Sequence, residues 1–326
     1  MPAPEARVTV AVSTAVFGVR ADAPGAPRLH VALVPRMREP FLDRWALPGT
    51  WLAADEELAD AALAPDVIGD GPHRVAFLHG LMGRGRNFTG PAKALADDFT
   101  VELLDLPDHG RSPWTDRVDY QEIADRVAEH LRAGLAADGP VHVLGHSMGG
   151  KVAMVLALRH PDLVDRLIVE DISPRLSPQA TDEFVHLLGT MLRMDLDSYE
   201  SRAEADAAMA EHVHDARVRG FLLQNLRREG GRFAWQPNVA MLFEHLEAVG
   251  SFPDPAAPED PDRVFDRPVL WLAGANSDYV RDEDVPRMKD LFPRVVRVTV
   301  RDAGHWLHAD QPEAFVSAVR TFLTAD

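Results

Sequence analysis

A serine between glycines, in the segment Gly145-His-Ser147-Met-Gly149, is the strongest candidate for a catalytic nucleophile. This G-x-S-x-G pattern follows a short apolar stretch, residues 141–144, and precedes residues 151–159, which are typical of a helix. A sharp turn from strand to helix strains its central residue and needs small neighbours, which the glycines provide. Such a turn would raise the Ser147 hydroxyl above a sheet edge. The Met148 N–H would then lie at a helix N-terminus, where it can stabilise an oxyanion.

Two other interpretations of this segment compete with a nucleophile. The first is a glycine-rich turn with an incidental serine, because the pattern alone is common. The second is a phosphate-binding loop, since Gly145 to Lys151 also matches G-x-x-x-x-G-K, with residues 167–171 as an acidic strand. The next residue, Val152, has no hydroxyl for Mg²⁺, which makes phosphate binding the less favoured interpretation.

A serine nucleophile needs a general base, and His305 is the best candidate. It lies in a loop after the last predicted strand, from which a histidine can reach over the sheet edge to Ser147. The chain order, with serine first and histidine last, also fits. His308 is the rival, but we expect it to belong to the following helix. We expect the remaining candidates to be structural: His79, His142, His146, His160, His212 and His214. The last two are two residues apart, a spacing that diverges on a helix and makes a poor metal site.

A second oxyanion donor is expected in the loop after the first strand of the core. The segment His79-Gly80-Leu81-Met82 occupies that place. The N–H groups of Leu81 and Met148 could therefore converge on one carbonyl oxygen, although an ordinary tight turn is the alternative.

These candidates need a scaffold, and predicted strands and helices alternate along the chain. The strands are residues 74–78, 100–105, 141–144, 167–171, 268–274 and 295–300, and the helices are 87–97, 120–135, 151–159 and 312–323. Such alternation predicts an α/β fold with a mostly parallel sheet covered by helices on both faces. Functional residues then collect at the carboxyl ends of the strands, where all the candidates lie.

Residues 74–326 resemble an α/β-hydrolase. The motifs that carry the resemblance are His79-Gly-Leu-Met-Gly83, Asp105-Leu-Pro-Asp-His-Gly-Arg-Ser112, Gly145-His-Ser-Met-Gly149 and Ala303-Gly-His-Trp-Leu-His308. Together with Asp171-Ile-Ser-Pro174, they resemble a subfamily of small esterases and acyl thioesterases found in bacteria and mitochondria. The chain departs from that subfamily at Asp108. The resemblance implies that residues 175–250, which we expect to be mostly helical, form a cap over the active site.

Two aspartates compete to orient His305. Asp278 follows the predicted strand that ends at Gly274, the commoner location in this fold, but stands one position later than usual. Asp171 ends the preceding strand, and Pro174 shapes a short turn there, within reach of His305. The resembling subfamily also places its acid at this position. We therefore predict Asp171, with Asp278 as the alternative.

Residues 1–66 look like a separate, β-rich extension. The segment Trp45-Ala-Leu-Pro-Gly49 and Glu56 resemble the start of a Nudix hydrolase signature. The Glu-Glu pair that binds Mg²⁺ in that family is missing, and Pro65 would stop the helix. The resemblance implies a truncated, non-catalytic remnant. An unrelated β-hairpin is the alternative, and residues 66–73 are the expected linker to residues 67–326.

Composition limits the partners of this 326-residue chain, whose hydrophobic content of 46% suits a full core. A formal charge of −17 argues against nucleic acid and anionic membranes. The lack of cysteine excludes disulfides and thiolate metal sites. We expect a cytoplasmic protein, because no stretch is long and apolar enough to span a membrane. Residues 8–19 mimic a signal peptide but read better as a strand, since Ser13 and Thr14 interrupt them.

Together, these features predict a carboxylic ester hydrolase that cleaves small acyl esters or thioesters through an acyl-enzyme. The serine excludes the dehalogenase and epoxide hydrolase branches, which need a carboxylate nucleophile. No cofactor and no metal are expected, and the extension could mediate homo-oligomer contacts. The alternative is a binding or scaffold protein that has kept the fold without the activity.

Overall fold

The chain divides into two compact units, Met1–Ala62 and Leu63–Asp326, in the computed structural model. The structure describes residues 11–12, 15–20, 28–33, 63–176, 178–253 and 264–325. In the helix that starts at Pro178, side chains are described from residue 183 onward. In the first unit, three antiparallel strands are described, in the order β1-β2-β3: β1 (Ala11–Val12), β2 (Ala15–Arg20) and β3 (Arg28–Leu33). The Nudix-like segment that follows lies outside the described residues, so that resemblance stays a prediction.

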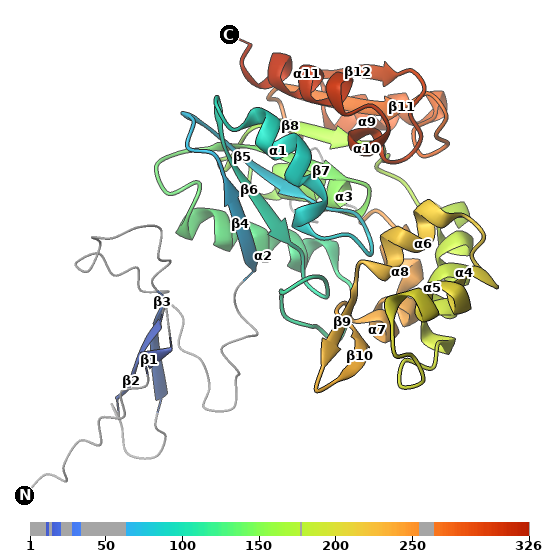
Figure 1. Cartoon of the computed structure of the whole chain (residues 1–326). Coiled ribbons are helices and arrows are strands. Elements are labelled where there is room, and N and C mark those ends of the chain that lie inside the picture. Colours follow the sequence, from blue (N-terminus) through green and yellow to red (C-terminus); the bar gives the residue numbers. More distant parts are fainter. Residues whose placement is uncertain are drawn as a thin grey trace, which may run out of the picture. The chain divides into compact units, whose positions relative to one another are not determined.

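A seven-stranded sheet forms the centre of the second unit, in the order β12-β11-β8-β7-β5-β6-β4 (Figure 1). Its strands are β4 (Ala64–Ile68), β5 (His73–Leu78), β6 (Phe99–Asp105), β7 (Val141–His146), β8 (Val164–Glu170), β11 (Val269–Gly274) and β12 (Val295–Val300). All pairs are parallel except β4 with β6. The central strands β7 and β11 are buried along their whole length, as continuous apolar runs in a sheet covered on both faces should be.

The predicted linker is shorter in the structure, because β4 takes up part of it. Residues 64–68 pair with β6 at the edge of the sheet, and the two units divide between Ala62 and Leu63 rather than after Asp66. Pro65, which we expect to stop a helix, lies in β4 instead, and an edge strand tolerates proline because one side of its backbone has no strand to bond.

Helices cover both faces of the sheet (Figure 1). They are α1 (Thr89–Leu95), α2 (Tyr120–Ala133), α3 (Met148–Arg159), α9 (Val285–Leu291), α10 (Leu307–Asp310) and α11 (Pro312–Leu323). Helix α2 begins where Asp119 accepts hydrogen bonds from the first free amides, and it buries Ile123, Val127 and Leu131 with α3 in one core. Helices α1 and α11 share the core on the other face. None of the described helices is long and apolar enough to cross a bilayer.

An insertion, defined here as residues 178–250, separates β8 from β11. It contains α4 (Pro178–Arg193), α5 (Arg202–Ala210), α6 (Ala216–Leu223), β9 (Leu226–Glu229), β10 (Arg232–Trp235), α7 (Val239–Glu244) and α8 (Leu246–Gly250). The β9–β10 hairpin departs from the mostly helical prediction. Its turn uses Gly230 and Gly231, both at positive φ, which glycine adopts without strain.

Candidate active site

Ser147 lies at the sharp turn between β7 and α3. Its φ of 52° and ψ of −118° are strained for a residue with a side chain. The turn is tight enough to require both glycines of the motif. A Cβ at Gly145 would lie 2.2 Å from the Gly149 carbonyl oxygen, and one at Gly149 would lie 2.4 Å from that of Leu78. The backbone N–H of Ser147 donates to the carbonyl of Glu170 on β8 at 3.0 Å, which fixes the turn against the neighbouring strand.

Asp171, rather than Asp278, is the carboxylate beside His305. The His305 Nδ1 atom lies 2.8 Å from Asp171 Oδ2, and Asp171 is completely buried. The Gly274 N–H donates to Asp171 Oδ1 at 2.9 Å, and the Ser277 hydroxyl donates to Oδ2. Three donors therefore surround the carboxylate and hold it in place beside His305. Asp278 is exposed, and none of the hydrogen bonds described for its loop joins its side chain to His305.

The His305 imidazole is held between two aromatic rings. The ring of Tyr279 stacks on it at 3.9 Å with an interplanar angle of 19°, and the His146 ring lies 4.7 Å away. Tyr279 also lines a cavity with Ser147, so the ring that stacks on His305 borders the same space as the serine. Among the described residues, no hydrogen bond joins the Ser147 hydroxyl to His305. In unliganded hydrolases, this contact often tightens only when substrate binds.

Two residues that line this cavity have backbone amides for which no hydrogen-bond partner is described. Leu81 and Met148 both line it beside Ser147 and are each only 4% exposed. Neither N–H donates a hydrogen bond to any part of the chain that the structure describes. Buried amides are nearly always paired, and an unpaired one is costly.

Two buried histidines shape the loop that carries Leu81. His79 Nδ1–H donates to the Gly80 carbonyl at 2.9 Å, and its Nε2 accepts from Leu106 N–H at 2.9 Å. His109 accepts from Met82 N–H at 3.1 Å. Burial, reinforced by the neighbouring His109, lowers the pKa of His79 to about 3. Both imidazoles are therefore neutral and serve as hydrogen-bonding supports, which agrees with the structural role expected for His79.

The cavity beside Ser147 is small, at about 20 Å³, which is room for one water molecule. Phe184, Leu246 and Val249 of the insertion close it. The insertion therefore lies over the carboxyl ends of the strands. Other apolar side chains of the insertion, such as Leu188 and Met191, are buried in the core. An acyl chain could enter only if these side chains move.

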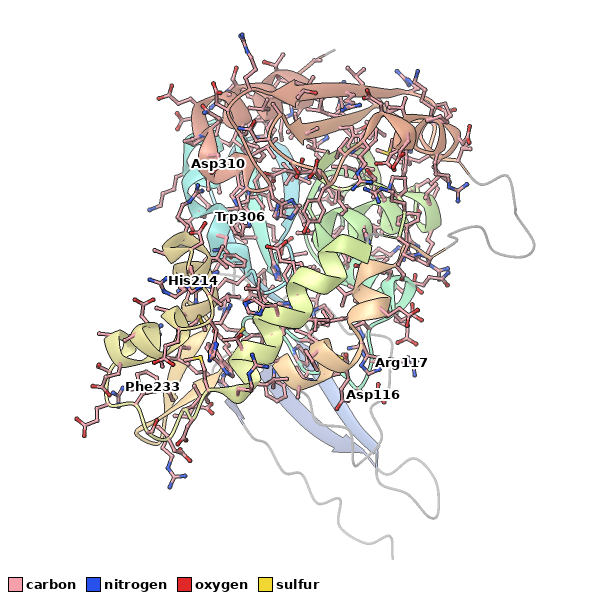
Figure 2. The ribbon with its side chains drawn as sticks, turned by 90° about the vertical axis from the view of Figure 1, so that its right-hand side faces the viewer. Asp116, Arg117, His214, Phe233, Trp306 and Asp310 are labelled. Carbon is pink, nitrogen blue, oxygen red and sulfur yellow. The ribbon has the colours of Figure 1, made fainter. Side chains whose placement is uncertain are left out.

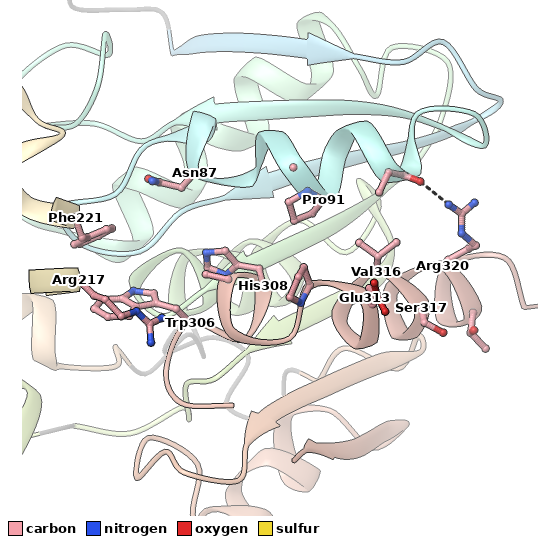
Figure 3. Close-up of a pocket in the computed structure, with 15 residues that line it drawn as sticks. Asn87, Pro91, Arg217, Phe221, Trp306, His308, Glu313, Val316, Ser317 and Arg320 are labelled. Atoms are coloured by element: carbon pink, nitrogen blue, oxygen red, sulfur yellow. Dashed lines mark hydrogen bonds between the residues drawn. The ribbon is translucent and has the colours of Figure 1, made fainter. Parts of the chain in front are cut away.

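A larger groove of about 810 Å³ lies elsewhere, between α1 and α11 (Figure 3). Pro91 of α1 faces Val316 of α11 across it, and Phe221 and Trp306 lie at one end. Ser147 does not line this groove. The chemistry therefore belongs to the smaller cavity.

Lys151 contradicts the phosphate-loop interpretation. Its side chain is only 2% exposed, and its ammonium group donates to the carbonyls of Gly250 and Ser251, each at 2.6 Å, and of Val249 at 3.4 Å. All three N–H donors are used to hold the end of α8, so none is left for a phosphate.

The rival base, His308, lies in α10 as expected. It is buried, and its Nδ1 lies 2.8 Å from Glu170 Oε1. His142 and His160 lie beside surface carboxylates, 3.3 Å from Asp165 and 2.6 Å from Asp125 respectively. The pair His212 and His214 is exposed. Figure 2 shows His214 on the insertion, well away from Phe233 at its outer end.

One group of buried side chains could hold a metal ion by composition. Ligand atoms of His146, Glu170 and His308 lie within 4.8 Å of one another. Hydrogen bonds engage part of the cluster, since His308 bonds Glu170 Oε1, and His146 Nε2 lies 2.8 Å from the His305 carbonyl oxygen, whereas the buried Glu170 Oε2 has no described partner. Each histidine therefore already uses one ring nitrogen within the fold.

Sequence reasoning missed three residues of this site: Ser277, Tyr279 and Glu170. The first two lie in the same short loop after β11 as Asp278. A loop at the carboxyl end of a strand was the available signal. No sequence pattern singled out Glu170, because a carboxylate at the end of a buried strand is equally typical of a residue that caps a turn or helix.

Comparison with known proteins supports the fold. A family model described as the alpha/beta hydrolase fold matches residues 74–312. The sn-1-specific diacylglycerol lipase ABHD11 of Mus musculus is 36% identical over 256 residues, which cover 76% of this chain and 80% of the lipase. Esterase YbfF of Escherichia coli is 30% identical over 251 residues, which cover 76% of this chain and 92% of the esterase.

A solved structure of a marine microorganism esterase superposes with a TM-score of 0.75 at 33% identity. The match covers 80% of this chain and 98% of the esterase. The predicted α/β fold is thus confirmed both by the sheet and by its relatives. The chain belongs to the α/β-hydrolase fold family.

Proposed function

We propose that this protein is a serine hydrolase that cleaves carboxylic esters through an acyl-enzyme. Ser147 is the nucleophile, His305 the general base and Asp171 the acid that orients it. Leu81 and Met148 donate the two N–H groups of the oxyanion hole. The observation that carries the proposal is the pair of buried, unpartnered amides beside Ser147. The relatives named as lipases and esterases support the same reaction class.

The reaction follows from the geometry of these groups. The Ser147 hydroxyl attacks the acyl carbonyl carbon while His305 Nε2 accepts its proton. Asp171 accepts the Nδ1–H of His305, at a separation of 2.8 Å, and stabilises the imidazolium. The two amides stabilise the oxyanion. His305 then protonates the leaving alkoxide or thiolate, and the acyl-enzyme is hydrolysed by a water molecule that His305 activates.

The insertion acts as a cap that sets the size and apolarity of the acyl group. Phe184, Leu246 and Val249 close the cavity, and apolar walls suit an acyl chain. Since the cavity measures about 20 Å³, the insertion must shift to admit substrate. One relative is named as a diacylglycerol lipase and others as esterases, so acyl esters of glycerol are included in the substrate class.

The proposal is tested with an activity-based fluorophosphonate probe and two substrate panels. Wild-type protein should be labelled and should hydrolyse p-nitrophenyl esters, while Ser147→Ala should do neither and should fold normally by circular dichroism. The acyl-chain preference, measured on p-nitrophenyl esters and acyl-CoA thioesters, separates ester from thioester hydrolysis. A folded wild-type protein that neither reacts with the probe nor cleaves either panel would favour the scaffold alternative.

Residues 1–62 are proposed to be non-catalytic. The residues proposed for the reaction all lie within the compact unit that starts at Leu63. A chain of residues 63–326 should therefore react with the probe at the same rate as the full chain. Loss of labelling in a folded truncated chain would show that the extension contributes to the site.

A further inference from the structure

Each member of the proposed catalytic triad has a buried neighbour in its own segment. These neighbours are the residue before the nucleophile, the residue before the acid, and the third residue after the base. All three are less than 10% exposed, and their polar atoms gather in one cluster. We call them the support set: His146, Glu170 and His308.

His146 reaches the backbone of the base itself. Its Nε2 lies 2.8 Å from the carbonyl oxygen of His305. A carbonyl oxygen can only accept, so Nε2 must carry the proton. Burial, with His305 and His308 nearby, lowers the pKa of His146 well below its ordinary value and keeps it neutral. His146 therefore donates one hydrogen bond to the residue whose ring must face Ser147.

Glu170 ties the same loop to the sheet from the other side. Its Oε1 atom accepts from the backbone N–H of His308 at 3.1 Å and lies 2.8 Å from His308 Nδ1. The Glu170 carbonyl accepts the N–H of Ser147 at 3.0 Å. One completely buried residue thus fixes both the nucleophile turn and the loop that follows the base.

We propose that the support set positions His305 for catalysis. His146 holds the carbonyl group of His305 by a hydrogen bond. Glu170 and His308 hold the next turn of the same loop. None of its members lines the cavity beside Ser147, and their described hydrogen bonds go to one another and to the backbone of the nucleophile and base segments. This inference rests on the proposed function, since it assigns the parts that orient its base. A loop held at both ends keeps the ring within the narrow geometry that proton transfer needs.

The test replaces the donor and keeps the volume. His146→Phe removes the hydrogen bond to His305, while His146→Gln can restore a donor at a similar reach. His142→Phe is the matched control, because His142 is also buried on β7 but lies beside Asp165. We expect His146→Phe to lower kcat roughly tenfold with KM within twofold of wild type, from the loss of one buried hydrogen bond. His146→Gln should recover part of the loss, and the control should stay within twofold.

A second readout separates positioning from general destabilisation. The His305 Nδ1 proton, bonded to Asp171, should give a far-downfield proton NMR resonance. In His146→Phe at temperatures where the fold is intact, this resonance should broaden through exchange with solvent. Glu170→Gln should act similarly, because it weakens the contact with His308 at nearly constant volume.

Three results would overturn the inference. The first is wild-type kcat with a sharp resonance in folded His146→Phe and Glu170→Gln. The second is a tenfold loss in the His142→Phe control as well. The third needs no variant: ¹⁵N NMR of the wild type that finds His146 protonated on Nδ1 instead of Nε2. Absence of Ser147-dependent hydrolysis in the wild type would instead contradict the proposed function.

Discussion

Asp171→Asn should separate the two candidate acids. Asn has nearly the same shape, and its Oδ1 can still accept the Gly274 N–H that now lies 2.9 Å from Asp171. Its amide nitrogen, however, would face His305 Nδ1 as a donor, where a carboxylate oxygen now lies at 2.8 Å. His305 would have to turn its unprotonated Nδ1 toward this group and carry its proton on Nε2. That tautomer cannot accept the Ser147 proton.

The expected loss follows from this tautomer exchange. Replacing a triad aspartate by asparagine lowers kcat by ~10⁴, equivalent to about 5.4 kcal/mol of transition-state stabilisation. KM should change little, because Asp171 does not line the cavity. The assay is steady-state hydrolysis of a short-chain p-nitrophenyl ester, with folding checked by circular dichroism.

Asp278→Asn is the matched control. Its side chain is exposed, and kcat should stay within a factor of about two, as for most surface substitutions. The reasoning is refuted if folded Asp171→Asn keeps kcat within tenfold of wild type. A collapse of kcat in Asp278→Asn would move the acid to the loop after β11.

Three further predictions test the supports of the site. Gly80→Ala should abolish ester hydrolysis in a folded protein, because its Cβ would lie 2.9 Å from His146 Nδ1 and 3.2 Å from Ser147 Cβ. An unchanged kcat would contradict this close approach of Gly80 to the two side chains. Burial holds the pKa of His79 near 3, below its unfolded value, so its contribution to stability is complete above about pH 6.5 and is lost as pH falls. As the pH falls, the free energy of unfolding measured with urea should decrease by up to about 1.4 kcal/mol per pH unit because of this group. If His79→Gln shows the same dependence of that free energy on pH as the wild type, His79 is not its source. Lys151→Met should lower the free energy of unfolding by about 2 kcal/mol, because the carbonyl groups at the end of α8 lose their hydrogen-bond donor. A Tm equal to that of the wild type would contradict this prediction.

The fold was largely predictable because its elements are local. Period and turn residues identify six of the sheet strands and four of the flanking helices. The short helices α9 and α10 were not predicted, and two β elements also escaped. Strand β4 contains Pro65, which reads as a breaker unless the strand is known to lie at an edge. The hairpin around Gly230 and Gly231 carries a turn signal, but a mostly helical context outweighed it. The predicted class of carboxylic ester hydrolase is confirmed by the relatives.

The proposed site can be predicted from the sequence only as far as chain position determines it. A motif predicts Ser147, and the chain order predicts His305. Asp171 and Asp278 follow adjacent strands, β8 and β11, so both lie at the same edge of the sheet, and only side-chain contacts distinguish them. The stacking of Tyr279 on His305 joins parts of the chain that no local pattern connects. The Nudix-like extension, the oligomer contacts and the cytoplasmic location stay predictions.

The alignment of β7 with β8 has a consequence for re-engineering this enzyme. His146 stands opposite Glu170 in the parallel register, and Ser147 and Asp171 are the residues that directly follow the two strands. Successive residues of a strand point to opposite faces, so sliding either strand by one residue would exchange an outward position for an inward one. A one-residue insertion there would therefore displace the proposed nucleophile, the proposed acid and the residues His146 and Glu170 together. Any redesign of this edge of the sheet has to keep the register of the two strands unchanged.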